Sequence, residues 1–344
     1  MNIDFHYYPI KAAAITAGFP EEDAQTIASY SQFVDDYSDF EPLHFKEIPT
    51  FAQHLAKPRK DDTWTFHPVT TGFENIIQTT RLLTTENQKN ILIPFHFITA
   101  QPLNTKVNNR RQWRVKPTTL TNNNEPSLIQ DLLLNTRQKY TTKPHPSDLI
   151  RIGILLHIYA DTYAHQGFSG FHNWENHSYL TEAKDNNNNT DITHQYKPNL
   201  YFVTPSVGHA NIGHAVDDSH ISFIIKQKKR KTNLKYSEIY MRNNTQEFLH
   251  ATEEIINYLR TCLQKEPMTK DEWNTLSEKF RQGFLTDYKA WHTIFPDIQF
   301  QYNKKDQYEL NSNFFFYNVI ADEIRRYVNG EKIVGTNFTA CKTK

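Results

Sequence analysis

The stretch LLHIYADTYAHQG, residues 155–167, decides the fold, because it has the pattern of a buried helix that carries polar groups on one face. His157, Asp161 and His165 follow one another at steps of four residues. Four residues advance an α-helix by about 400°, so the three side chains share one stripe on successive turns. Buried imidazole and carboxylate groups need partners. A divalent cation would supply one, and hydrogen bonds to the backbone are the alternative.

Helical patterns continue on both sides of this stretch. Ser147 is expected to cap the helix at its start, and Gly167 is expected to end it. Apolar periodicity and capping residues predict further helices at residues 5–18, 20–36, 72–88, 126–140, 243–264, 270–285 (with Thr269 and Glu272 as a capping box) and 314–328, closed by Asn329-Gly330. The sequence therefore predicts an all-α fold, a compact multi-helix bundle with long polar loops.

The segments between these helices have weaker patterns. The apolar run NILIPFHFITA, residues 90–100, is expected to be a strand or a buried extended segment, with Pro94 against a central strand. Residues 40–70 and the DNNNNT segment from Asp185 are expected to be loops. The basic run KQKKRK, Lys226 to Lys231, is expected to be a solvated loop or edge, with a nucleic-acid patch as the alternative.

Composition places the chain among globular proteins. Of 344 residues, 38% are hydrophobic and 13% aromatic, which is enough for a core. Lysine plus arginine equals aspartate plus glutamate at 38 each, so no global field attracts nucleic acid or an anionic membrane. We expect one mostly helical domain over residues 1–335, with a metal-site half at 1–220, a helical part at 235–330 and a tail at 336–344.

Cysteine and histidine usage narrows the chemistry. Cys262 and Cys341 lie far apart, so neither a disulfide framework nor a thiolate metal site is expected. The sixteen histidines favour metal or acid–base chemistry. The first residues lack the pattern of a secretory signal, and no stretch has the ~18 to 20 apolar residues of a membrane span. We expect a cytoplasmic protein with no obligate protein partner, and export by a signal-independent route stays open.

A second group of candidate ligands lies in GHANIGHAVDDSH, residues 208–220, for which Ser206 would cap a helix. It contains His209 and Asp217, and it also contains His214 and Asp218 at positions i and i+4. Carboxylate and imidazole groups without a nearby thiolate suit zinc, manganese or iron in an open catalytic site. The alternative is a helix N-terminus with ordinary polar side chains.

Three further places carry candidate ligands. Asp35 and Asp36 end a predicted helix, where paired acids are unfavourable against the helix dipole unless a cation lies nearby. His6 lies near the start of the chain. His96, between two phenylalanines, is either a hydrogen-bonded core histidine or a ligand.

The order of these pieces resembles that in a known superfamily. IDFHYY, SQFVDD, PFHF, LLHIYADTYAHQGF and GHA, over roughly residues 1–220, are similar to motifs of the zinc-dependent phospholipase C and single-strand nuclease superfamily, and of an uncharacterised bacterial family related to it. The resemblance implies an all-helical phosphodiesterase that holds one to three ions of zinc, or of manganese or iron.

The resemblance also implies roles for single residues. His157 and Asp161 would be metal ligands, with Asp161 bridging two ions, and His165 would take a different coordination position or lie behind the ligands. The remaining ligands would be His214 with Asp218, or His209 with Asp217, together with His6, Asp36 or Asp35, and His96.

The function that we expect is hydrolysis of a phosphate ester by metal-activated hydroxide. Asp161 would bridge the ions, and Asp217 or Asp35 would orient the water or a liganding imidazole. The substrate could be a phospholipid or a nucleic acid. The alternative from a different class is a helical protein that binds metal without catalysis, or one that is inactive.

Overall fold

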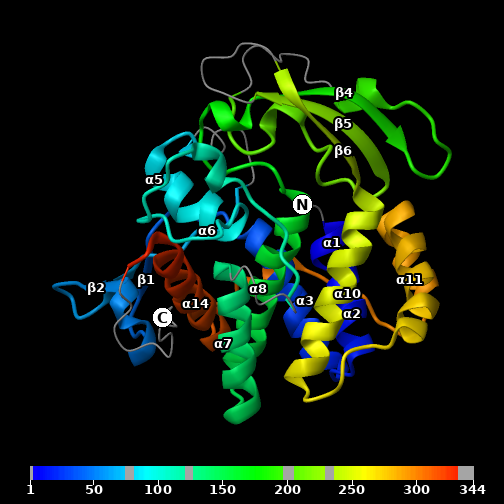
Figure 1. Ribbon diagram of the computed structural model, residues 1–344. Helices are drawn as coiled ribbons and strands as arrows, with labels where there is room; N and C mark the ends of the chain where they lie inside the picture. Colours follow the sequence, from blue (N-terminus) through cyan, green and yellow to red (C-terminus); the bar gives the residue numbers. More distant parts are fainter. Residues whose placement is uncertain (1–2, 74–80, 121–126, 197–204, 229–235, 332–344) are drawn as a thin grey trace, which may run out of the picture.

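The computed structural model describes residues 3–73, 81–120, 127–196, 205–228 and 236–331 (Figure 1). About 54% of it is helical, and it also contains two three-stranded antiparallel sheets. The protein is therefore mixed α/β, and the expectation of an all-α bundle is wrong.

Helix α8 (Pro146–Ala164) lies in the middle of the helical body (Figure 1). It contacts α3 (Glu21–Asp36), α7 (Leu128–Thr142), α10 (Asn244–Cys262) and α14 (Ser312–Asn329). The other α-helices in the described residues are α1 (Ile3–His6), α2 (Tyr8–Ala17), α5 (Thr85–Asn87), α6 (Ile93–Phe95), α9 (Thr193–Tyr196), α11 (Lys270–Leu285), α12 (Trp291–Ile294) and α13 (Lys304–Gln307). Nearly all of α8 is buried, so its polar stripe cannot face bulk water.

The crossing of α3 and α8 is close because α8 has a glycine there. A Cβ atom at Gly153 would lie 2.5 Å from the carbonyl oxygen of Ile27 and 3.1 Å from the backbone nitrogen of Ser31. The absence of a side chain lets the two backbones approach. As a result, His157, one turn further along α8, reaches the backbone of α3.

The larger sheet was missed by the sequence analysis. Its strands β4 (Ser178–Asp185), β5 (Ile221–Lys228) and β6 (Tyr236–Asn243) pair in that order, and the sheet lies across one end of the helical body (Figure 1). Side chains of β5 alternate between buried and partly exposed. The alternation runs for only eight residues and ends in lysines, so the sequence predicts only a solvated loop or edge from Lys226 onward. The basic run thus begins inside β5, and Lys229 to Lys231 lie outside the described residues.

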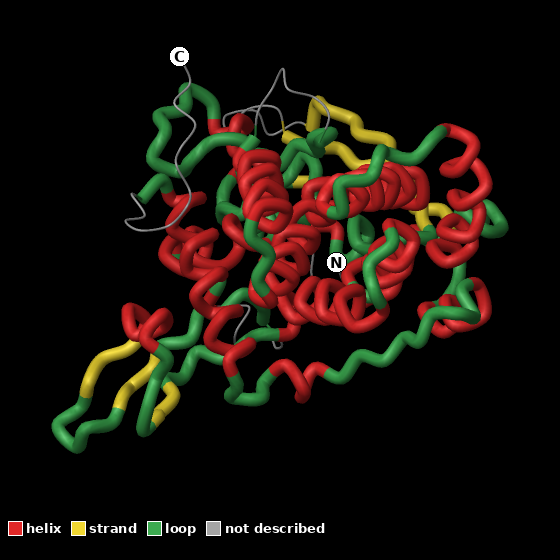
Figure 2. Tube along the Cα trace, turned by 90° about the horizontal axis from the view of Figure 1, so that it is seen from below, coloured by secondary structure: helices red, strands yellow, loops and turns green. Residues whose placement is uncertain are grey.

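A smaller sheet occupies the region expected to be loop. Strands β1 (Leu43–Phe45), β3 (Trp64–Phe66) and β2 (Ala56–Pro58) pair in that order and project from the helical body (Figure 2). The inner end packs on α14, where the rings of Phe66 and Phe315 lie 5.3 Å apart.

Several helix predictions are confirmed. The boundaries of α11 match, with the capping box of Thr269 and Glu272, and α14 ends at Gly330 in a left-handed conformation. The expected helix at 5–18 is split between α1 and α2. The expected helix at 72–88 falls partly outside the described residues, as does the tail at 336–344.

Three local predictions are wrong. Residues 88–95 are helical rather than extended, because Pro94 lies in the first turn of α6, where a missing N–H costs little. The cap of α8 is His145, not Ser147, with Asp148 completing a capping box. Residues 206–220 hold only a short 3₁₀ turn at Ala210–Ile212, because Gly208 and Gly213 have positive φ angles that interrupt a helix.

Of the helices in the described ranges, none combines the length and the apolarity needed to cross a bilayer. Cys262 is a buried free thiol. Cys341 lies outside the described residues.

Candidate metal centre

The polar stripe of α8 is buried and in contact with other polar groups. His157 and Asp161 are fully buried, and His165 is 2% exposed. Each of the three meets candidate ligands from other segments. The step of four residues therefore places His157 and Asp161 in one polar cluster and His165 in a second one.

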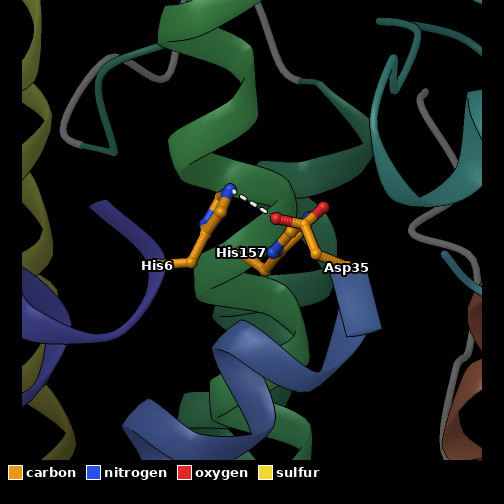
Figure 3. Close-up of side chains that lie close together, drawn as sticks. All are labelled: His6, Asp35 and His157. Carbon is orange, nitrogen blue, oxygen red and sulfur yellow. Dashed lines mark ion pairs between the residues drawn. The ribbon is translucent and has the colours of Figure 1, made fainter. Parts of the chain in front are cut away.

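The first cluster, which we call group A, joins α1, α3, α6 and α8. It consists of His6, Asp35, His96, His157 and Asp161. His6 ends α1, Asp35 lies at the end of α3, and His96 follows α6 directly. Figure 3 shows His6, Asp35 and His157 converging from three elements.

Three atoms of group A have the spacing of ligands around a tetrahedral ion. His96 Nδ1 lies 3.4 Å from His157 Nε2 and 3.2 Å from Asp161 Oδ2, and His157 Nε2 lies 3.4 Å from that same oxygen. Zinc bonds of about 2.0 to 2.2 Å at tetrahedral angles separate neighbouring ligand atoms by about 3.3 to 3.5 Å. Asp35 Oδ1 lies 3.7 Å from both ring nitrogens and can complete the set.

Backbone carbonyls fix the orientation of both imidazoles. His157 Nδ1–H donates to the carbonyl of Ser31 at 2.9 Å, and His96 Nε2–H donates to the carbonyl of Thr71 at 2.7 Å. In a neutral imidazole the other nitrogen then carries a lone pair. Two lone pairs 3.4 Å apart repel each other unless a proton or a cation lies between them. This is the arrangement that liganding histidines adopt.

His6 adds an uncompensated polar group. Its side chain is fully buried, and neither ring nitrogen has hydrogen-bond geometry to any residue in the described part of the chain. Its Nε2 lies 3.3 Å from Asp161 Oδ1 and 3.8 Å from Asp35 Oδ2. Since the other oxygen of each aspartate faces His96 and His157, both carboxylates lie between two candidate ion positions.

The second cluster, group B, lies at the C-terminal end of α8 and consists of His165, His209 and Asp217. His165 Nε2 lies 3.3 Å from Asp217 Oδ1, and His209 Nε2 lies 3.6 Å from Asp217 Oδ2. Each imidazole again donates its other N–H to a backbone carbonyl, that of His96 at 2.6 Å and that of Gly213 at 2.8 Å. Both of the nitrogens that face Asp217 are thus oriented as ligands.

The electrostatics of the two groups favour a bound cation. Burial opposes the charge of Asp161, but the imidazoles of His165 and His157 hold the pKa of its carboxyl well below the ordinary value. Burial also opposes the charge of Asp217, but its interactions with His209, His165 and His214 hold the pKa of this carboxyl well below the ordinary value. Burial lowers the pKa of His6 and of His209 to about 4. At neutral pH the imidazoles of His6 and His209 are therefore neutral, which is the state that ligates metal. The pKa of His96 is instead raised, because Asp161 and Asp35 outweigh burial, so a bound cation would take the place of a proton there.

The remaining predicted ligands lie outside these groups. Asp36 Oδ2 accepts a hydrogen bond of 2.5 Å from the Tyr302 hydroxyl, and Asp218 Oδ2 accepts one of 2.7 Å from Tyr196. His214 is on the rim of group B, with its side chain 86% exposed and its Nδ1 3.6 Å from Asp217. Asp35 and Asp217, predicted as catalytic groups, lie among the candidate ligands of groups A and B.

Sequence reasoning missed the groups that hold the imidazoles. The carbonyls of Ser31, Thr71 and Gly213 carry no signal in the sequence, since every residue has a carbonyl. The i, i+4 spacing of Ser31 and Asp35 on α3 could have indicated that one turn of α3 faces α8.

Comparison with known proteins gives one match. A protein-family model described as "Family of unknown function (DUF6765)" matches residues 1–337, nearly the whole chain. No curated protein and no solved structure matches it.

Proposed function

We propose that this chain, which belongs to the DUF6765 family of unknown function, is a metal-dependent hydrolase of phosphate esters. The observation that carries the proposal is the triangle of His96 Nδ1, His157 Nε2 and Asp161 Oδ2, with sides of 3.2 to 3.4 Å and with both imidazoles turned by backbone carbonyls. The donor set of nitrogen and carboxylate oxygen suits zinc, or manganese or iron. Group A would hold one or two ions, and group B one more.

The charge of the clusters suits an anionic substrate. Asp35, Asp161 and Asp217 contribute three negative charges, while His6 and His209, with a pKa of about 4, are neutral at neutral pH. Two or three divalent cations would turn this balance positive. A phosphodiester, which carries one negative charge, is then attracted to the site.

Bound divalent cations in such a cluster neutralise phosphate oxygens and lower the pKa of water towards ~7, so that hydroxide exists at neutral pH. The chain supplies position and access. Asp35, with a side chain 21% exposed, is the most accessible carboxylate of group A and is placed to orient an attacking water. The buried side chains of His157 and Asp161 exclude other water from the cluster. The water oxygen bonds to phosphorus while the bond to the leaving oxygen breaks.

The resemblance to zinc-dependent phospholipases C and single-strand nucleases supports the same reaction class. In both the motifs and the structure, His6, His96 and the His157–Asp161 pair of α8 come from three separate segments of the first half of the chain. The presence of two sheets shows that the likeness does not extend to an all-helical fold.

The test measures metal content and turnover together. Protein purified with added zinc or manganese is expected to hold at least one equivalent by elemental analysis and to hydrolyse bis-p-nitrophenyl phosphate. His157→Ala and Asp161→Asn are expected to lower both. His145→Ala, at the cap of α8, is the matched control and should keep the metal.

Three outcomes separate the hypotheses. Metal content near zero in well-folded wild type would contradict the metal centre itself. Full metal content with no turnover of phosphodiester, phosphatidylcholine or single-stranded DNA would instead support the alternative of a non-catalytic metal-binding protein. Turnover at the wild-type rate in His157→Ala would show that group A does not take part in the reaction.

A further inference from the structure

The outer face of the larger sheet exposes aliphatic side chains. Ile239 is 64% exposed and Met241 is 77% exposed. Met241 pairs with Ile224 of β5, and Ile239 pairs with Lys226. Residues directly opposite on antiparallel strands share a face, so these four side chains form one patch.

The opposite face of the sheet forms part of the core. Phe223 and Ile225 are each 3% exposed, and the Arg242 guanidinium lies 5.5 Å from the Phe223 ring, on the inner side. In a sheet with one buried face, the other face is usually polar. Ile239 and Met241 break this rule, and an exposed apolar patch of this kind marks an interaction surface.

The charge of the patch is positive. Lys226 lies within it, and the register adds Glu182, opposite Ile224, and Lys184, opposite Ser222. Glu182 and Lys184 pair with each other at 2.8 Å, which leaves the charge of Lys226 in excess.

We propose that this face of the β4–β5–β6 sheet docks onto the surface of a bilayer that contains anionic lipid. Aliphatic side chains enter the boundary between headgroups and acyl chains, and lysines approach anionic headgroups. Tyr179, 38% exposed and opposite Lys226, lies on the same face, and a tyrosine beside aliphatic side chains suits the headgroup region of a bilayer. A nucleic acid would use a series of aromatic platforms for successive bases, whereas Ile239 and Met241 at the centre of the patch are aliphatic. The observations therefore favour a membrane over a nucleic acid.

Docking of the β4–β5–β6 sheet onto a membrane would narrow the substrate class of the proposed hydrolase. If the chain hydrolyses phosphate esters, docking would bring it to phospholipids, and this consequence rests on the proposed function. The docking of the sheet onto a membrane does not depend on the proposed function, because vesicle binding is measured without any turnover.

The experiment is sedimentation of the metal-loaded protein with vesicles of phosphatidylcholine alone, or of phosphatidylcholine with phosphatidylglycerol. Wild type is expected to bind the anionic vesicles and to release at high salt. The double variant Ile239→Glu with Met241→Glu should bind at least tenfold more weakly, and Lys226→Glu should also bind more weakly. Leu310→Glu, at a 57% exposed leucine outside the sheet, is the matched control and should bind like wild type.

Three results would overturn the docking surface. One is wild type that stays in solution with both kinds of vesicle. Another is an equal loss of binding in Leu310→Glu, which would show a general effect of charge. The third is a wild-type dimer, unbound to vesicles, that dissociates in the double variant, which would make a second copy the occupant. Vesicle binding without hydrolysis would count against the proposed function and leave the docking surface intact.

Discussion

Single residues at this centre act through the direction in which their ring nitrogens point. His157 Nδ1 and His96 Nε2 each face a backbone carbonyl, so the other ring nitrogen of each imidazole faces Asp161. A buried lone pair opposite a second lone pair is unfavourable until a cation separates them. The side chains are therefore arranged for a ligand before it arrives, which reduces the cost of ordering on binding.

The adjacent aspartates at the end of α3 give the sharpest residue-scale prediction. Asp35→Asn removes a charged oxygen that faces three imidazoles, so metal affinity should fall more than tenfold. Asp36→Asn is the matched control, because that carboxylate bonds to Tyr302 and an amide oxygen can still accept from the hydroxyl. Isothermal titration of metal into chelator-treated protein measures the metal affinity of both variants. Equal affinities in the two variants would contradict the assignment of Asp35.

At the scale of elements, the distance between α3 and α8 is predicted to set metal affinity. Gly153→Ala places a Cβ atom 2.5 Å from a backbone oxygen of α3 and should cost about 1 to 3 kcal/mol of unfolding free energy. Because the same contact positions Ser31 and Asp35, metal affinity should fall as well. Denaturant unfolding measures the free energy of unfolding, and titration of metal into chelator-treated protein measures the metal affinity.

Gly283→Ala is the matched control for that prediction. Its Cβ atom would lie 2.5 Å from the Trp291 ring, at the contact of α11 with α12, so it should also destabilise the protein. Metal affinity should stay at the wild-type value. A similar loss of affinity in both variants would mean that stability, and not the α3–α8 spacing, governs binding.

A buried arginine links the sheet to group B and gives a second prediction at this scale. Arg242 donates to the carbonyl of Ala164, at the end of α8, and to that of Val216, next to Asp217. Arg242→Met should cost on the order of 3 kcal/mol and release the metal of group B while group A keeps its own. Arg151→Met, which removes a buried arginine paired with Glu323, is the control and should keep all metal. Elemental analysis that finds equal metal in both variants would contradict this role.

The sequence predicted some of these elements and not others. Long helices with caps, such as α10, α11 and α14, were predictable because periodicity and capping are local signals. Short strands such as β5 were not, because their stability comes from pairing with segments far away in the chain. The four-residue spacing on α8 was enough to predict His157 and Asp161 as candidate metal ligands. The choice of Asp35 over Asp36 could not be made, because it depends on which neighbour faces α8.

At the scale of the whole molecule, groups A and B hold distant segments together. Their candidate ligands run from His6 in α1 to Asp217, just before β5, so the two groups join segments that are far apart in the sequence. The buried carboxylates of Asp161 and Asp217, together with the half-buried Asp35, are stabilised by a nearby positive charge. We therefore expect bound metal to stabilise the entire chain and not a single loop.

Metal removal tests this expectation. A ligand that binds the folded state and is present at 1,000 times its dissociation constant adds about 4 kcal/mol to the free energy of unfolding. Chelator-treated wild type should thus unfold several degrees below the metal-loaded protein in scanning calorimetry, and re-addition of zinc should restore the transition. Asp161→Asn, which removes the charge shared by both ion positions of group A, should show a smaller chelator-induced shift, and Asp36→Asn a shift of wild-type size. An unfolding temperature that chelation leaves unchanged in wild type would show that the buried imidazoles and carboxylates satisfy one another without a cation.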